Sequence, residues 1–338
     1  MKRPFWFLLF AASTGLAIAQ QSPKPALLAL SKQDHTLAIV DPSDLHVVAR
    51  IPVGDDPHEV TASANGRIAY VSNYGFGAFH TLTVIDLVGQ RSLGVIDLGA
   101  LRGPHGLAFA AGKVWFTAEA AKAIESYDPS THSIDWIMGT GQNRTHMLYV
   151  FPDGKRIVTT NVNSGTVSII EKSEVHADAL PNSLTPPPHC EDWLLTVVSV
   201  GRGSEGFDLS PGGKEAWVAN AGDETISIVD IAEKKVTATL PANAPGANRL
   251  KFTPDGRRVL VSAGSYLVVL DAATRKEIKR MSVGHGLGGI QIQPDGARAY
   301  VASGLDGFVT VIDLNALEVV ARIDVGKGPD GLAWAARQ

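Results

Sequence analysis

The stretch IQPDGARAYVASGLDGFVTVIDLNALEVVARIDVG, residues 292–326, decides the fold because the chain repeats it. Residues 252–284, FTPDGRRVLVSAGSYLVVLDAATRKEIKRMSVG, and residues 209–240, LSPGGKEAWVANAGDETISIVDIAEKKVTATL, are two further copies. Weaker copies extend the series back to residue 63, at a period of about 40–47 residues. A period of this length indicates a propeller or a solenoid, in which each unit packs against its neighbours.

Each copy reads as four short β-strands separated by turn residues. An Asp-Gly or Gly-Gly pair follows the first strand, and glycine supplies the positive φ that a tight hairpin turn needs. The second and third strands are rich in β-branched residues, which suit a pleated sheet. The fourth strand carries more charge, which favours an exposed edge. Four antiparallel strands at this period predict one blade of a β-propeller.

The two ends of the chain predict seven blades in a closed ring. Residues 26–51 supply the second, third and fourth strands of a blade, whereas GPDGLAWAA, residues 328–336, supplies a first strand with no unit after it. An open solenoid would not explain these complementary half-units. We therefore expect an all-β, seven-bladed propeller with four antiparallel strands per blade, closed by the C-terminal strand joining the N-terminal blade.

The units VGKGPDGLAW, SPGGKEAWVANAGDETISIVD and QPDGARAYVASGLDGFVTVID resemble the YVTN-type, YncE-like family of seven-bladed propellers. The resemblance covers nearly the whole chain after the leader and implies an exported propeller. Such propellers variously bind ligands, partners or DNA, or act as lactonases, lyases or haem-bearing enzymes. Because one fold supports many functions, the resemblance does not choose among these activities.

The first residues, MKRPFWFLLFAASTGLAIAQQ, predict a signal peptide over residues 1–19 and a mature propeller over residues 20–338. Lys2 and Arg3 precede an apolar run shorter than the roughly 20 residues of a membrane span, and Ala-Ile-Ala at residues 17–19 fits a cleavage site. We therefore expect a periplasmic or secreted monomer without a membrane span. Loss of the leader changes the formal net charge from −4 to about −6, which makes nucleic acid an unfavourable partner.

Residues 171–193, EKSEVHADALPNSLTPPPHCEDW, form an insertion between the third and fourth strands of the fourth blade. The three consecutive prolines predict an extended, solvated loop. His176, His189 and Cys190 fit no standard zinc spacing, so a tolerated surface insertion is the simpler interpretation. The chain also lacks a Cys-x-x-Cys-His sequence, which excludes covalent c-type haem.

One position of the repeat, directly before each innermost strand, collects unusual side chains. In chain order this position holds His58, His105, His146, Glu205, Asn248, Gly288 and Asp330. Because innermost strands surround the axis of a propeller, we expect these residues at the mouth of the central channel. Three imidazoles and a carboxylate are a common ligand set for a divalent transition metal. The predicted metal ligands are therefore His58, His105, His146 and Glu205.

Basic side chains surround the same mouth, and six of the ten histidines map to this one face. Guanidinium groups suit the capture of carboxylate or phosphate. The predicted ligand-binding residues are Arg102, Arg144, Arg202, Asn248, Arg249, His285, Asp330, His35 and His80.

These observations favour a non-catalytic, exported propeller that binds a small anionic ligand or a protein partner at the His/Arg-rich mouth. No catalytic-triad motif, nucleophile elbow or phosphate-binding loop supports an enzyme. A metal-dependent hydrolase, lactonase or lyase that uses His58, His105 and His146 is the alternative hypothesis. DNA or cell-envelope binding, by analogy with YncE-like propellers, is a third.

Overall fold

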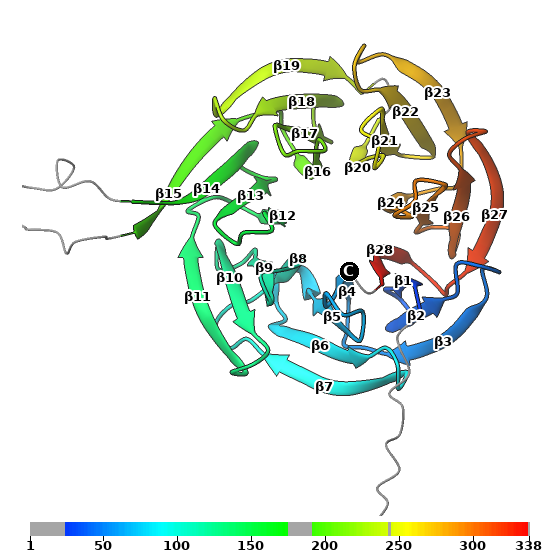
Figure 1. The fold of residues 1–338 in the computed structure, drawn as a ribbon, viewed down its shortest axis with the longest axis horizontal. Helices are drawn as coiled ribbons and strands as arrows, with labels where there is room; N and C mark the ends of the chain where they lie inside the picture. Colours follow the sequence, from blue (N-terminus) through cyan, green and yellow to red (C-terminus); the bar gives the residue numbers. More distant parts are fainter. Residues whose placement is uncertain (1–23, 175–190, 243–244, 337–338) are drawn as a thin grey trace, which may run out of the picture.

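The computed structural model describes residues 24–174, 191–242 and 245–336. These residues form a ring of seven four-stranded antiparallel sheets around a central axis (Figure 1). The helical structure in the described ranges is one short 3-10 turn, η1 (Gly75–Gly77). The expected all-β, seven-bladed propeller is therefore confirmed.

Each blade contributes one strand to each of four concentric layers (Figure 1). The innermost strands are β4 (Pro57–Ala62), β8 (Pro104–Ala110), β12 (Thr145–Val150), β16 (Ser204–Leu209), β20 (Ala247–Phe252), β24 (Leu287–Ile292) and β28 (Pro329–Ala335). The second strands are β1 (Ala26–Ser31), β5 (Ile68–Asn73), β9 (Lys113–Ala118), β13 (Arg156–Asn161), β17 (Glu215–Asn220), β21 (Arg258–Ala263) and β25 (Arg298–Ser303). The third strands are β2 (Thr36–Val40), β6 (Thr81–Asp86), β10 (Ala123–Asp128), β14 (Thr166–Glu174), β18 (Thr225–Asp230), β22 (Tyr266–Asp271) and β26 (Phe308–Asp313). The outermost strands are β3 (Val47–Pro52), β7 (Arg91–Asp97), β11 (Ser133–Gly139), β15 (Glu191–Ser199), β19 (Lys235–Pro241), β23 (Glu277–Ser282) and β27 (Glu318–Asp324).

The first blade joins the two ends of the chain. Strand β28 pairs antiparallel with β1, with Ala26 opposite Ala335 and Leu27 opposite Trp334. This sheet has the order β28-β1-β2-β3, as the two half-units predicted. Closure leaves no innermost strand unpaired with a neighbour, so the ring has no open end.

The hydrophobic core lies between neighbouring blades. Trp217 of the fifth blade is fully buried and its ring packs 5.5 Å from that of Phe252 in the sixth blade. In contrast, outermost strands such as β11 and β19 alternate exposed and half-buried residues. The apolar second and third strands therefore hold the blades together, while the charged fourth strands face solvent.

The insertion in the fourth blade is shorter than the sequence predicted. Strand β14 continues to Glu174 and β15 begins at Glu191, so residues 171–174 and 191–193 are strand rather than loop. The longer ladder places Trp193 with its ring 4.9 Å from that of Trp136 in the third blade. His176, His189 and Cys190 lie outside the described residues, as does the predicted signal peptide.

The ring has two faces of different chemistry. We call the face on which the innermost strands begin the histidine face, because His58, His105 and His146 lie there; the face on which they end, near Trp334, is the tryptophan face. The predicted mouth position is the second residue of each innermost strand and does not precede it, because the ladder begins one residue earlier, for example with Pro57 opposite Asn73. These residues therefore belong to the innermost strands and not to the loops that precede them.

The third residue of the innermost strand controls how closely the blades approach at the axis. Four blades have glycine there, and a Cβ would lie only 2.2–2.6 Å from a backbone oxygen of the next blade. These glycines are Gly106, Gly206, Gly289 and Gly331. The remaining blades have Glu59, Met147 and Arg249, whose side chains line the channel.

One buried carboxyl group in the third blade lacks compensation. Glu125, in β10, is fully buried, and neither carboxylate oxygen has a hydrogen-bond partner among the described residues. Burial raises the pKa of Glu125 to about 8. The folded protein therefore holds this group protonated at neutral pH.

Within the described ranges, no helix is long and apolar enough to cross a membrane.

Substitution of Gly331 by alanine should destabilise the closing blade. The added Cβ would lie 2.2 Å from the His58 carbonyl oxygen, and relief of this clash requires backbone movement. We expect Gly331→Ala to lower the free energy of unfolding by about 2 kcal/mol, measured by urea denaturation. The matched control is Gly139→Ala, whose Cβ meets nothing within 4 Å; an equal loss in both variants would contradict close packing at the axis.

Glu125→Gln should change how stability depends on pH. Because the folded pKa is raised from 4.5 to about 8, the contribution of Glu125 is fully present below pH 4.5 and is lost as pH rises through 8. We expect wild-type stability to fall relative to the variant by about 3 kcal/mol between pH 5 and pH 8. Urea denaturation at both pH values measures this difference, and parallel pH profiles would refute an uncompensated carboxyl.

Candidate functional site

Three histidine rings lie side by side at the histidine face, each from the second residue of a neighbouring innermost strand. The ring centroids of His58 and His105 are 4.9 Å apart, and those of His105 and His146 are 3.8 Å apart. Their exposed fractions are 7%, 1% and 1%. The repeat position that collected these residues in the sequence therefore brings them together, but in a buried cluster rather than at an open rim.

The turns that follow the second strands complete the cluster with residues that the sequence analysis missed. Glu119 follows β9, and its Oε1 lies 2.5 Å from Nδ1 of His146. The hydroxyl of Tyr74, which follows β5, donates a hydrogen bond to the other Glu119 oxygen. The sequence did contain a pattern that could have identified these residues. The position after each second strand holds long polar residues in the first three blades and small or apolar ones in the other four. In chain order the residues are Lys32, Tyr74, Glu119, Val162, Ala221, Gly264 and Gly304.

His146 lies between two carboxylates. Besides Glu119 at Nδ1, Oε2 of Glu205 lies 2.8 Å from Nε2, although this approach lacks the alignment of a hydrogen bond. Burial opposes the charged imidazole, but the two carboxylates outweigh it and raise the pKa of His146. For Glu205, burial is likewise outweighed, by His146 and the nearby arginines, which lower its pKa to about 2. These shifts favour the charged form of both groups, an imidazolium beside an ionised carboxylate.

His105 has the opposite character. Burial and the neighbouring His146 charge hold the pKa of His105 well below its ordinary value. Its Nδ1 is buried without a hydrogen-bond partner in the described structure. A neutral imidazole with an unused ring nitrogen is the form in which histidine binds a metal.

His105, Glu119 and His146 are the three residues that fit a metal ion best. Each offers one ligand atom, and these atoms lie within 4.8 Å of one another. Ligands bound at about 2.0–2.2 Å from a single zinc ion lie roughly 3–4 Å apart, so a small contraction would bring all three onto one ion. The unused Nδ1 of His105 shows that the protein alone does not satisfy this donor set.

His58, which the sequence also predicted as a metal ligand, already has partners at both ring nitrogens. Its Nδ1 lies 3.2 Å from the backbone oxygen of Asp56, and its Nε2 lies 2.8 Å from Nζ of Lys32. Lys32 also donates to Asp330, at 3.1 Å. Burial lowers the pKa of His58, consistent with a neutral ring that accepts from Lys32. Glu119 therefore takes the place among the candidate ligands that the sequence analysis assigned to His58.

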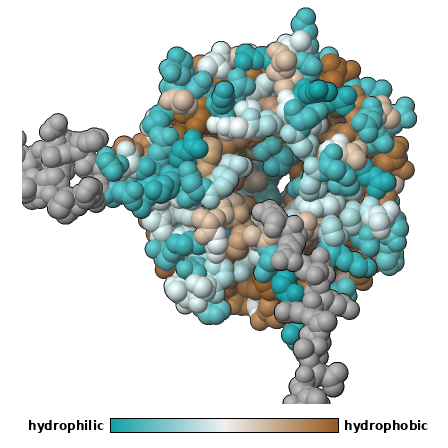
Figure 2. Space-filling model, in the orientation of Figure 1, coloured by the Kyte–Doolittle hydropathy of each residue, from teal (hydrophilic) through white to brown (hydrophobic). Residues whose placement is uncertain are grey.

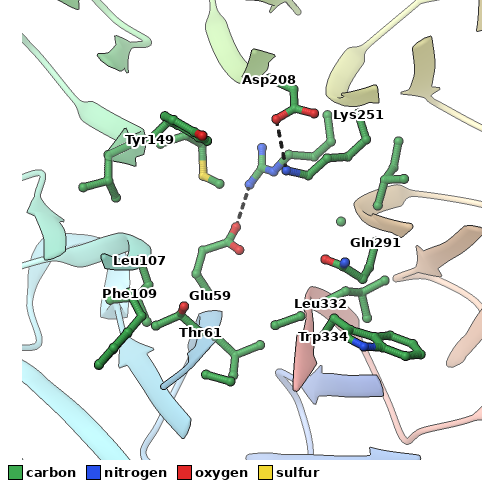
Figure 3. A pocket seen from close by; sticks show the side chains of 18 of the residues that line it. Glu59, Thr61, Leu107, Phe109, Tyr149, Asp208, Lys251, Gln291, Leu332 and Trp334 are labelled. Atoms are coloured by element: carbon green, nitrogen blue, oxygen red, sulfur yellow. Dashed lines mark hydrogen bonds and ion pairs between the residues drawn. The ribbon is translucent and has the colours of Figure 1, made fainter. Parts of the chain in front are cut away.

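Two arginines balance the charge of the cluster. Arg144 lies between Glu119, at 3.5 Å, and Glu205, at 3.3 Å. Arg249 of the sixth blade reaches Glu59 of the second blade at 3.2 Å, and each side chain is only 12% exposed. This ion pair spans the channel (the dashed line at Glu59 in Figure 3), and both of its residues line the cavity beyond the histidine cluster. Asn248 supports Arg249 by accepting a hydrogen bond from it at 2.6 Å.

The outer rim is less suited to anion capture than the sequence predicted, because most of its basic groups already face a carboxylate. Arg102 is the exception and makes no ion pair within the described residues. The rim pairs are His35–Asp55 at 2.9 Å, His80–Asp97 at 2.9 Å, His285–Asp306 at 3.0 Å and Arg202–Asp223 at 2.6 Å. An anionic ligand there would compete with these aspartates.

No protein-family model and no curated protein matches the chain. Solved structures share its fold. A functionally unknown protein from Desulfotomaculum acetoxidans is 12% identical with a TM-score of 0.76, over 93% of this chain and 99% of that one. A putative 6-phosphogluconolactonase from Bacteroides uniformis is 16% identical with a TM-score of 0.72, over 92% and 99%. The dihydro-heme d1 dehydrogenase NirN, in complex with DHE, is 15% identical with a TM-score of 0.63, over 91% and 74%. At these identities the likeness shows the propeller fold alone.

Glu205→Gln should destabilise the cluster, because it leaves His146, Arg144 and Arg249 with one fewer buried countercharge. We expect a loss of about 3 kcal/mol at pH 7, measured by urea denaturation. Because the folded pKa of Glu205 is depressed to about 2, its contribution is present above its ordinary pKa and is lost as pH falls toward 2. The difference between wild type and variant should therefore shrink on acidification.

The matched control is Glu191→Gln, which removes a half-exposed carboxylate 2.6 Å from Lys172. A surface pair of this kind contributes less than about 1 kcal/mol. If the two substitutions cost the same, the buried cluster would not depend on charge balance.

Proposed function

We propose that this protein is an exported, non-catalytic propeller of the YVTN type that binds one divalent transition-metal ion through His105, Glu119 and His146. The buried, unused Nδ1 of His105 beside Glu119 and His146 is the observation that carries the proposal. A buried ring nitrogen without a partner costs free energy, and binding of a metal ion would recover it. Glu205 supplies a carboxylate oxygen, a candidate fourth ligand atom, close to the His146 imidazole.

Nitrogen and carboxylate ligands in this ratio suit zinc and its first-row neighbours, with copper binding more tightly than nickel, cobalt or manganese. Binding must displace the proton that His146 holds between its two carboxylates, so affinity should fall as pH falls. Arg144 and Arg249 lie close to Glu205 and compete with the ion for this carboxylate.

The bound ion also gives the expected anionic ligand a place to bind. A hollow of about 370 Å³ lies beside the cluster and is bordered by Tyr74, Phe76, Glu119, Asn143 and Arg144. A metal in the cluster supplies an electrophilic centre for a carboxylate or phosphate oxygen, and Arg144 lies at the same hollow. Most cations at the outer rim are already paired with aspartates, so we expect the metal ion rather than the rim to attract the anionic ligand.

Metal content and calorimetry test the proposal directly. Protein purified without chelator should hold about one equivalent of metal by elemental analysis, and the apoprotein should bind Zn²⁺ with the same stoichiometry. We expect His105→Ala and His146→Ala each to weaken Zn²⁺ binding at least tenfold, with weaker wild-type binding at pH 5.5 than at pH 7.5.

His285→Ala is the matched control, because it removes an imidazole from the exposed rim of the same face. It should bind Zn²⁺ as the wild type does, and His58→Ala should retain one equivalent. Wild-type protein that neither contains metal nor binds Zn²⁺ would overturn the proposal, as would equal losses in the rim and cluster variants.

A further inference from the structure

A second cavity lies at the other end of the channel, toward the tryptophan face. Its volume is about 650 Å³, within the range of small-molecule sites. The Glu59–Arg249 ion pair lines it and lies between it and the histidine cluster. Figure 2 shows a hollow at the centre of the ring, bordered by both hydrophilic and hydrophobic residues.

One side of this cavity is a row of polar side chains. The fifth residue of four successive innermost strands, β12, β16, β20 and β24, supplies Tyr149, Asp208, Lys251 and Gln291 (Figure 3). Asp208 accepts from Lys251 at 3.3 Å and from the Phe252 backbone at 2.9 Å. The Tyr149 hydroxyl forms no hydrogen bond within the described structure. The row therefore presents donors and acceptors side by side.

The opposite side is apolar and aromatic. In β8 and β28 the fifth residue is alanine, and the residues on either side of it line the cavity instead. These are Leu107 and Phe109 from the third blade and Leu332 and Trp334 from the first (Figure 3). The pocket thus has hydrogen-bonding groups on one side, whereas on the other Phe109 and Trp334 lie on either side of Thr61 (Figure 3).

The cavity is also electrically balanced. Its two cations, Arg249 and Lys251, are each paired with a carboxylate, Glu59 and Asp208. A strongly charged ligand would have to break one of these pairs. A neutral ligand with donors and acceptors along one edge and a flat apolar surface would leave both pairs intact.

We infer that this cavity binds a neutral, planar heteroaromatic molecule, and specifically a purine base. Alternating donors and acceptors on the edge of a base match the polar row of Tyr149, Asp208, Lys251 and Gln291. The ring face matches the indole of Trp334, which lines the cavity, because proteins recognise unstacked bases by edge hydrogen bonds and aromatic stacking. The site is independent of the proposed metal centre, from which the Glu59–Arg249 pair separates it.

Fluorescence titration with 2-aminopurine tests the inference on the full-length protein. Stacking should quench the probe saturably, adenine should displace it, and adenosine monophosphate should not, because both cations are already paired. We expect Gln291→Leu and Trp334→Leu each to raise the dissociation constant at least tenfold, consistent with the loss of an edge contact or a stacking partner. The matched control, Gln33→Leu on the histidine face, should bind as the wild type does.

Trp334 also packs in the core, 6.2 Å from the Tyr300 ring, so Gln291→Leu decides the outcome if Trp334→Leu fails to fold. Absence of saturable binding to wild-type protein would overturn the inference, as would an unchanged dissociation constant in Gln291→Leu. Adenosine monophosphate binding as tightly as adenine would refute the preference for a neutral ligand. His105→Ala should bind 2-aminopurine normally, which separates failure of this site from failure of the metal centre.

Discussion

Antiparallel pairing between β28 and β1 joins the last described strand to the first, with Ala26 opposite Ala335. Both channel sites depend on this contact, because an open array would not hold seven innermost strands around one axis. The close approach continues on both sides of β28, where Gly331 meets the His58 carbonyl and Gly289 meets the Asp330 carbonyl. Closure therefore also determines how narrow the channel is and which side chains meet across it.

Burial of charge on the histidine face follows from that narrowness. An imidazolium at His146 is stable there because Glu119 and Glu205 lie on either side of it. A second positive ring 3.8 Å away would have no such compensation, so His105 stays neutral. The charged form is thus favoured at one imidazole while its neighbour keeps an unused ring nitrogen, and with Glu119 the two rings could hold a metal ion.

The Glu59–Arg249 pair gives the two ends of the channel separate chemistry. On one side lie titratable groups and candidate metal ligands. On the other lies a charge-balanced pocket with a polar side and a largely apolar side. Leaving either partner buried alone would be costly, so the pair is expected to persist while ligands bind at either end. The two proposed ligands would therefore not compete for the same residues.

The sequence by itself determined the seven blades, the closing strand and the shared position of His58, His105 and His146, because a structural repeat places equivalent residues at equivalent points. It also contained Glu119 at a repeat position that distinguishes the first three blades. Only the tertiary structure decided that Lys32 contacts Nε2 of His58, that aspartates pair with most rim cations, and that Arg249 forms an ion pair with Glu59. Those choices depend on distances across the axis between distant blades, and a repeat pattern does not encode such distances.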